Sequence, residues 1–135
     1  MKIDTNKCYS NNNTFLILDN YYKNIFIKNP FYDKKLKCII FDCFINYSDF
    51  IKLNIPETVY SLKFYNYYDN LIINNLPPNI IKITFCELFY KLENLSPQIQ
   101  KIKILCDTKY AVKTFIKNVP FGCIVVNNNG KIYLT

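Results

Sequence analysis

The chain has 135 residues, which is enough for one compact domain and too few for a second of similar size. Half of the residues are apolar, so wholesale disorder is excluded, and 12 Tyr and 11 Phe against two Gly favour strands over helices. Ala111 is the only alanine, which argues against a helical bundle.

The charge is strongly basic but unusual in kind. All 17 basic residues are Lys, ten residues are acidic, and the formal net charge is +7. Such a charge ordinarily favours nucleic acid or an acidic membrane as a partner. However, Lys, Asn, Ile, Phe and Tyr are all encoded by codons rich in A and T, so a nucleotide bias accounts for much of the lysine content. Because there is no Arg for bidentate base contacts, any nucleic-acid binding is expected to be nonspecific and salt-dependent.

Residues 1–13 are polar and lack the apolar centre of a secretory signal, so we expect them to form an N-terminal arm or partial cap. No stretch of the chain approaches the roughly 18–20 apolar residues that cross a bilayer. We therefore expect a soluble, intracellular protein without a membrane partner. Its six cysteines are then expected to be reduced.

Between residues 14 and 121, apolar residues recur at the first, fourth and sixth positions of short segments, for example at Leu36, Ile39 and Phe41. The fourth positions lie 23, 23, 21 and 19 residues apart. Because residues two apart on a strand point the same way, each segment predicts one strand whose fourth and sixth positions face the core. These predicted core residues are Leu16, Leu18, Ile39, Phe41, Leu62, Phe64, Ile83, Phe85, Ile102 and Ile104.

A second sequence pattern recurs with the same spacing as the first. Most units end in Asn, an apolar residue and Pro, as at Asn54–Pro56, Asn75–Pro77 and Asn118–Pro120. Pro suits a turn or an unpaired strand end. One strand per unit cannot bury its face alone, whereas stacked units share a continuous core. The sequence therefore predicts a leucine-rich-repeat-like solenoid, mainly β, with parallel stacked strands and about five units over residues 14–121. An antiparallel sandwich with regularly spaced turns is the alternative.

Residues 122–135 predict a C-terminal hairpin cap. The apolar segments Cys123–Val126 and Lys131–Leu134 flank Asn127–Gly130, and Asn-Gly between apolar segments is a strong hairpin signal. If this hairpin leaves an edge exposed, that edge could pair two copies of the protein.

Two of these units resemble the FNIP repeat, a relative of the leucine-rich repeat found in slime moulds and in giant DNA viruses of amoebae. The resemblance rests on Leu53–Phe64 and Asn75–Phe85, which follow the family's core of Ile-Pro, Val or Ile, Leu and Phe. Tyr68-Asp69 and Phe89-Tyr90 stand where the family's Phe-Asn pair would fall. The resemblance implies a leucine-rich-repeat-like fold and protein binding, and it supplies no catalytic residues. It also implies the cytoplasm of a native or infected cell as the location, with packaging in a virus particle left open. Many viral members also resemble F-box proteins, but the pattern begins near residue 14, so we expect no F-box here.

The sequence offers little for catalysis. It has no His for Ser-His or Cys-His chemistry, and Gly122 and Gly130 cannot form a phosphate loop. There is no Cys-x-x-Cys pair, and Asp42 and Glu87 are expected to be solvated loop charges. We therefore expect neither an enzyme nor a cofactor, metal or small-molecule substrate.

The third, fifth and seventh strand positions alternate with the core positions and should form an open face. Its first half is apolar with acids, and its second half is rich in lysine. The predicted partner-binding residues are Ile17, Ile40, Lys63, Tyr65, Lys82, Lys101 and Lys103. The favoured partner is a protein with an acidic patch. Self-association, as a structural or virion-associated protein, is the second hypothesis, and nonspecific nucleic-acid binding is the third. The structural alternative is that the lysines only solvate the sheet.

Overall fold

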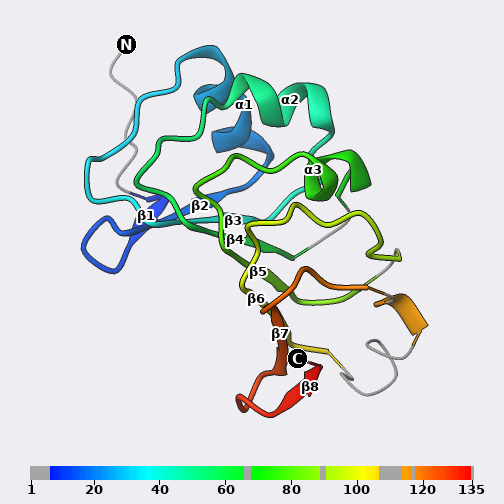
Figure 1. Ribbon diagram of the computed structural model, residues 1–135. Coiled ribbons are helices and arrows are strands. Elements are labelled where there is room, and N and C mark those ends of the chain that lie inside the picture. The colour runs from blue at the N-terminus through cyan, green and yellow to red at the C-terminus, as the bar shows by residue number, and fades with distance from the viewer. Residues whose placement is uncertain (1–6, 66–67, 89–90, 107–113, 117, 135) are drawn as a thin grey trace.

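A computed structural model describes residues 7–65, 68–88, 91–106, 114–116 and 118–134. Eight strands form one sheet, and they follow one another across it in chain order (Figure 1). The strands are β1 (Tyr9–Ser10), β2 (Phe15–Leu18), β3 (Cys38–Phe41), β4 (Ser61–Phe64), β5 (Lys82–Phe85), β6 (Lys101–Ile104), β7 (Ile124–Asn127) and β8 (Ile132–Leu134). The prediction of a mainly β protein with a mostly parallel sheet is confirmed.

Strands β2 to β7 are parallel, and each pairs with the next in a register that keeps equivalent positions side by side. The fourth positions of the sequence pattern therefore form one row across the sheet. This row consists of Leu16, Ile39, Leu62, Ile83, Ile102 and Val125, each 0% exposed. An antiparallel sandwich is excluded by this pairing.

Strand β7 has a second role beyond the expected hairpin. It pairs with β8 in antiparallel fashion, as the Asn-Gly signal predicted, but it also continues the parallel register from β6. The sequence mark for this was present, because Asn118-Val119-Pro120 precedes Val125 much as Asn54-Ile55-Pro56 precedes Leu62. The parallel set thus extends beyond residue 121.

Each end of the sheet is closed by an antiparallel hairpin (Figure 1). At the N-terminal end, β1 pairs with β2 across a turn in which Asn11, Asn12 and Asn13 have φ of 53°, 57° and 64°. Asn adopts this left-handed conformation more readily than most residues. Cys8 is buried, and the Tyr9 hydroxyl accepts a hydrogen bond from the Asp33 amide at 3.0 Å. Residues 7–13 therefore form an edge of the sheet, and residues 1–6 of the expected N-terminal arm or partial cap lie outside the described residues.

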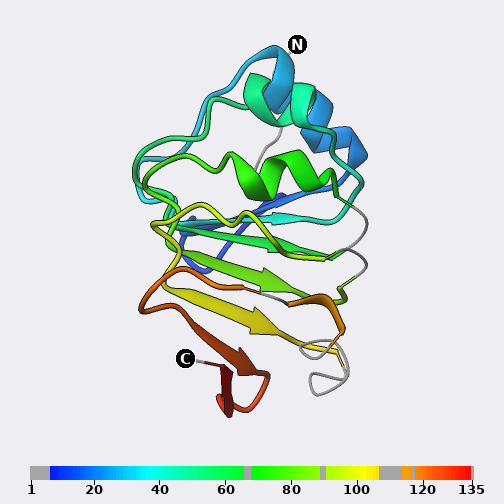
Figure 2. The same cartoon turned by 45° about the vertical axis from the view of Figure 1, so that its right-hand side comes forward.

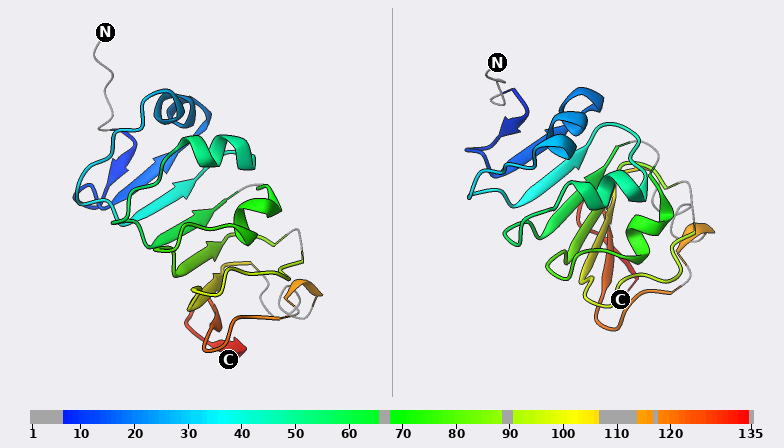
Figure 3. Two further views of the ribbon diagram at one scale, coloured as in Figure 1. Left: turned by 45° about the horizontal axis from the view of Figure 1, so that its top comes forward. Right: turned by 90° about the horizontal axis from the view of Figure 1, so that it is seen from above.

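Short helices follow the first three parallel strands: α1 (Asn20–Lys28), α2 (Tyr47–Lys52) and α3 (Asn70–Asn74). Each begins at a residue whose side chain accepts a backbone amide of the first turn, namely Asp19, Asn46 and Asp69. Helices of nine, six and five residues are not stable alone, so packing must hold them. All three lie on the same side of the sheet (Figures 2 and 3).

The core lies between the sheet and these connections. Phe26, Phe50 and Ile72 of the helices belong to the same buried cluster as the fourth and sixth strand positions. Within it, the Phe64 ring stacks between two neighbours, at centroid distances of 5.1 Å to Phe41 and 6.0 Å to Phe85. Among the described residues, all helices therefore pack on one face of the sheet, and none lies over the opposite face.

Polar side chains also link one connection to the next. Asp69 caps α3 through one carboxylate oxygen and accepts the Tyr47 amide of α2 through the other, at 3.0 Å. Ser96 is buried, accepts the Leu76 amide at 3.2 Å and donates to the Ile73 carbonyl at 3.4 Å. These bonds satisfy buried backbone groups where the connections are irregular.

Candidate functional site

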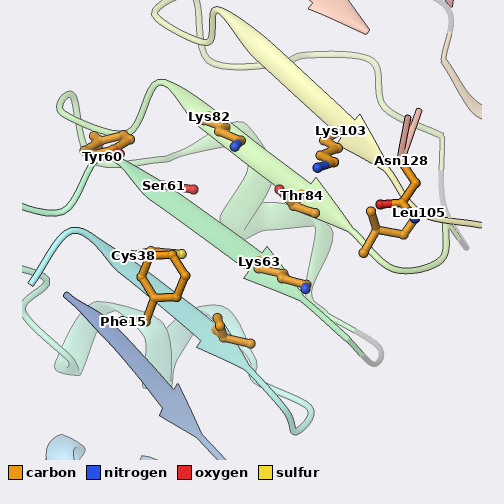
Figure 4. A pocket seen from close by; sticks show the side chains of 11 residues that line it. Phe15, Cys38, Tyr60, Ser61, Lys63, Lys82, Thr84, Lys103, Leu105 and Asn128 are labelled. Carbon is orange, nitrogen blue, oxygen red and sulfur yellow. The ribbon is translucent and has the colours of Figure 1, made fainter. Parts of the chain in front are cut away.

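The uncovered face of the sheet is hollowed into a groove of about 280 Å³ (Figure 4). Strands β2 to β6 and the turn between β7 and β8 all contribute to its lining. The lining residues are Phe15, Cys38, Ile40, Tyr60, Ser61, Lys63, Lys82, Thr84, Lys103, Leu105 and Asn128. Most of them occupy the third and fifth strand positions, as alternation along a strand requires.

Thr84 lies at the centre of the basic half of this face. Its neighbours across the sheet are Lys63 on β4 and Lys103 on β6. Lys82 lies two residues earlier on the same strand and therefore on the same face. In Figure 4 the ammonium groups of Lys82 and Lys103 lie on either side of the Thr84 hydroxyl. The parallel register thus gathers lysines that are about 20 residues apart in the chain.

The remaining predicted basic residues surround this centre. Lys63 places its ammonium group 4.7 Å from the centroid of the Tyr65 ring, a cation–π contact at the end of β4. Lys101 pairs with Lys82 across the sheet but does not line the groove. Within the described part of the chain, Lys63, Lys82, Lys101 and Lys103 form no ion pair. Their charge is therefore available to a partner.

Crowding of these lysines affects their titration. Partial burial lowers the pKa of Lys82, and the ammonium groups of Lys101 and Lys103 lower it further. Like charges on adjacent strands destabilise a sheet. An anion in the groove would relieve this repulsion.

The apolar half of the face departs from the prediction at one residue. Phe15 and Ile17 on β2 are 37% and 36% exposed. Ile40, which was expected to be exposed, is only 8% exposed, so that expectation is wrong. It lies on β3 between Ile17 and Lys63 of the flanking strands, and their side chains cover most of it. Ile40 contributes to the floor of the groove rather than to its rim.

Several groove residues were not among the predicted site residues. Ser61 and Thr84 are each 7% exposed and occupy the third and fifth strand positions, so alternation alone could have found them. Tyr60 precedes β4 and Asn128 comes from the hairpin turn. Their presence in the groove depends on loop geometry, which the pattern of apolar residues does not specify.

The surroundings of the cysteine thiols suit a structural rather than a reactive role. Cys38, Cys43, Cys86 and Cys123 are reduced, and burial raises the pKa of each. Cys43 donates to the Leu18 carbonyl at 3.4 Å, across adjacent connections. Thiols with raised pKa are poor nucleophiles at neutral pH. Within the described ranges, no three His, Cys, Asp or Glu side chains are grouped to hold a metal ion.

Comparison with known proteins gives no further identification. No family model, curated protein or solved structure matches this chain. Among the residues that the structure describes, no helix has the length and apolar character to span a bilayer.

Proposed function

We propose that this chain is a leucine-rich-repeat-like solenoid related to the FNIP repeat, and that it binds a protein partner through its open sheet face without catalysing a reaction. The solenoid is supported by the shared register of β2 to β7, and by the helices that follow β2, β3 and β4 on the same side of the sheet. The amino-acid sequences of two units support the relation to the FNIP repeat, namely Leu53–Phe64 and Asn75–Phe85.

One observation carries the binding proposal: a single concave surface combines unpaired lysines with exposed apolar side chains. Lys82 and Lys103 line the same groove as Phe15. Solvated lysines alone would not require exposed Phe15 and Ile17 beside them, and a contiguous apolar area rimmed by charge is typical of interaction surfaces. A partner with acidic and apolar side chains would complement both halves.

The size of the face indicates what kind of partner fits. Six parallel strands spaced by about 4.8 Å span roughly 24 Å, and four residues per strand span roughly 13 Å. The resulting area of about 300 Å² is well below the roughly 800 Å² that each partner buries in a stable globular complex. We therefore expect a short segment of a partner protein, bound with moderate affinity, or a larger contact that includes the loops beside the sheet.

Partner selection with matched variants tests this proposal. A displayed peptide library is selected against the native chain, and the enriched peptides are then measured against two variants. Lys63→Glu with Lys82→Glu and Lys103→Glu should abolish binding, whereas Lys28→Glu with Lys34→Glu and Lys52→Glu, at exposed positions elsewhere, should preserve it. Selected peptides that bind both variants equally would exclude the open face as the binding surface.

Self-association is the second candidate. Strand β8 ends the sheet, so one of its edges has no neighbour among the described strands. Such an edge can pair with another copy. Light scattering at two protein concentrations tests this, and a monomeric mass at both removes it. Nucleic-acid binding has less support, because Phe15, Ile17 and Ile40 in the first half of the face offer no positive charge to a phosphate backbone.

A further inference from the structure

The groove contains a local arrangement of donors around Thr84. Lys63 and Lys103 flank Thr84 on adjacent strands, and Lys82 precedes it by two residues on the same face. Neighbouring strands lie about 4.8 Å apart and alternate residues about 7 Å apart, so all three lysine side chains start within reach of one point above Thr84. Figure 4 shows the Lys82 and Lys103 ammonium groups on either side of that point.

The Thr84 hydroxyl is available to a ligand. Thr84 is 7% exposed as a residue and lines the groove, and its hydroxyl forms no hydrogen bond among the described residues. It is not one of the buried oxygens that lack a partner, so it is accessible from the groove. Ser61, also 7% exposed, is the neighbour of Lys82 on β4 and adds a second hydroxyl to the lining. None of the described residues that line the groove carries a carboxylate.

We propose that Thr84, Lys82 and Lys103 form a subsite for a phosphate monoester, carried by a phosphorylated side chain of the partner segment, with Lys63 as an additional contact. This inference rests on the proposed function and specifies the chemistry that the open face recognises. The ammonium groups would donate to the non-bridging phosphate oxygens, and the Thr84 hydroxyl would donate to one of them. Such charge-assisted hydrogen bonds are the strong ones in proteins.

A phosphate monoester fits better than the other anions. A carboxylate carries one charge and would leave most of the ammonium groups uncompensated, whereas a phosphate monoester carries nearly two at neutral pH and offers three acceptor oxygens. A nucleic-acid backbone needs charges spread along a path. Here the lysines surround one hydroxyl, and β2 and β3 offer Phe15, Ile17 and Ile40 instead.

The titration of Lys82 adds a readout for anion binding. Partial burial lowers its pKa, and the charges of Lys101 and Lys103 lower it further. A bound dianion should reverse this shift and raise the pKa of Lys82.

The test is an NMR titration of the full chain, labelled with nitrogen-15, against N-acetylphosphoserine amide. Saturable shifts should appear first at the amides of Thr84, Lys82 and Lys103. N-acetylaspartate amide should bind about tenfold more weakly, because it has half the charge. Binding of the phosphoserine probe should also weaken between about pH 7.5 and pH 5, since the second phosphate pKa is near 6. Acidification can only add positive charge to the lysines, so this loss would come from the probe itself.

Variants locate the subsite. Thr84→Val removes the hydroxyl with little change in volume, and Lys103→Gln removes one charge, so each should weaken the phosphoserine probe about tenfold. Thr84→Ser should restore binding, and Lys52→Gln, on exposed α2, is the matched control. Shifts spread over many surface lysines, equal affinity for the aspartate probe, or unchanged affinity in Thr84→Val and Lys103→Gln would each overturn the proposal. So would tighter binding of a DNA oligonucleotide than of a phosphorylated peptide of equal charge.

The subsite and the proposed function can fail separately. If the phosphoserine probe does not bind but selected peptides still lose affinity on Lys82→Glu, the subsite is wrong and the face remains a binding surface. If Lys82→Glu, Phe15→Ser and Ile17→Ser all leave those peptides bound unchanged, the open face itself is not the binding surface.

Discussion

The two faces of the sheet differ in how strongly packing constrains their residues. On the covered face, Leu62 and Ile83 are neighbours in a row whose members are all Leu, Ile or Val and all fully buried. On the open face, one residue away, Ser61 is the neighbour of Lys82, and Lys63 is the neighbour of Thr84. Packing constrains every position of the covered face alike, because each side chain contacts its equivalents on both neighbouring strands. The open face is free of that constraint, so its composition can vary with function.

The open face even carries an arrangement that weakens the sheet. Lys82 and Lys101 are direct neighbours across β5 and β6, and like charges in this position are destabilising. The covered face contains no such conflict. This arrangement and the exposure of Phe15 both support the proposal that the open face binds a partner.

The largest expected difference between the faces is in stability. Ile83→Ala should lower the free energy of unfolding by about 3 kcal/mol, because it leaves a cavity in the stacked core. Its neighbour Thr84, on the opposite face, provides the matched control: Thr84→Ala should lower stability by less than about 1 kcal/mol. Urea denaturation followed by circular dichroism measures both. Equal losses would mean that the two faces are packed alike.

The aromatic stack should give the next largest effect. Phe64→Leu removes the ring between Phe41 and Phe85 and should lower the free energy of unfolding by about 1–2 kcal/mol. Tyr65→Leu, at the adjacent exposed position, should stay within about 0.5 kcal/mol. The same urea titration compares them. A smaller loss for Phe64→Leu than for Tyr65→Leu would contradict the assignment of the stack to the core.

The hydrogen bonds between neighbouring connections should contribute no more to the free energy of unfolding than the aromatic stack does. Ser96→Ala leaves the Leu76 amide without its acceptor and should lower the free energy of unfolding by about 1 kcal/mol. Ser48→Ala, at an exposed position of α2, is its control and should have little effect. Hydrogen exchange should show faster exchange of the Leu76 amide in the first variant alone. Unchanged protection would show that this bond does not hold the connection.

The smallest effect concerns titration. Lys101→Gln should raise the pKa of Lys82 by removing a neighbouring charge, whereas Lys52→Gln should not, and carbon-13 NMR of the lysine side chains measures the pKa directly. Because the folded-state pKa of Lys82 is below its unfolded value, the unfolded chain binds more protons between the two. The contribution of Lys82 to stability therefore increases as the pH rises through that window toward about 10.4. Lys82→Gln should remove this increase.

Much of the sheet could be predicted from the sequence because the buried strand positions recur at a regular spacing. The row Leu16, Ile39 and Leu62 repeats at the spacing of one strand and one connection, and parallel pairing converts that spacing into register. The lysines of the open face followed from alternation alone. The prediction that Ile40 is exposed was wrong, because alternation gives the direction of a side chain but not how far its neighbours cover it.

Other features depend on contacts that no periodic pattern contains. The pattern leaves open the conformation of the connections, where the capping residues Asp19, Asn46 and Asp69 start three short helices. It did not reveal that β7 continues the parallel set, because the hairpin signal at Asn127–Gly130 dominated that region. The position of Thr84 between Lys63 and Lys103 requires the register of three strands at once.

We propose that the covered face stabilises the fold and that the open face binds a partner protein. Measuring both stability and affinity in one variant tests this most directly. In the variant Lys63→Glu with Lys82→Glu and Lys103→Glu, both the free energy of unfolding and the affinity for a selected peptide are determined. We expect stability to stay within about 1 kcal/mol of the native chain, or to rise, while affinity is lost. Retained affinity, or a loss of affinity accompanied by loss of the folded state, would contradict the claim.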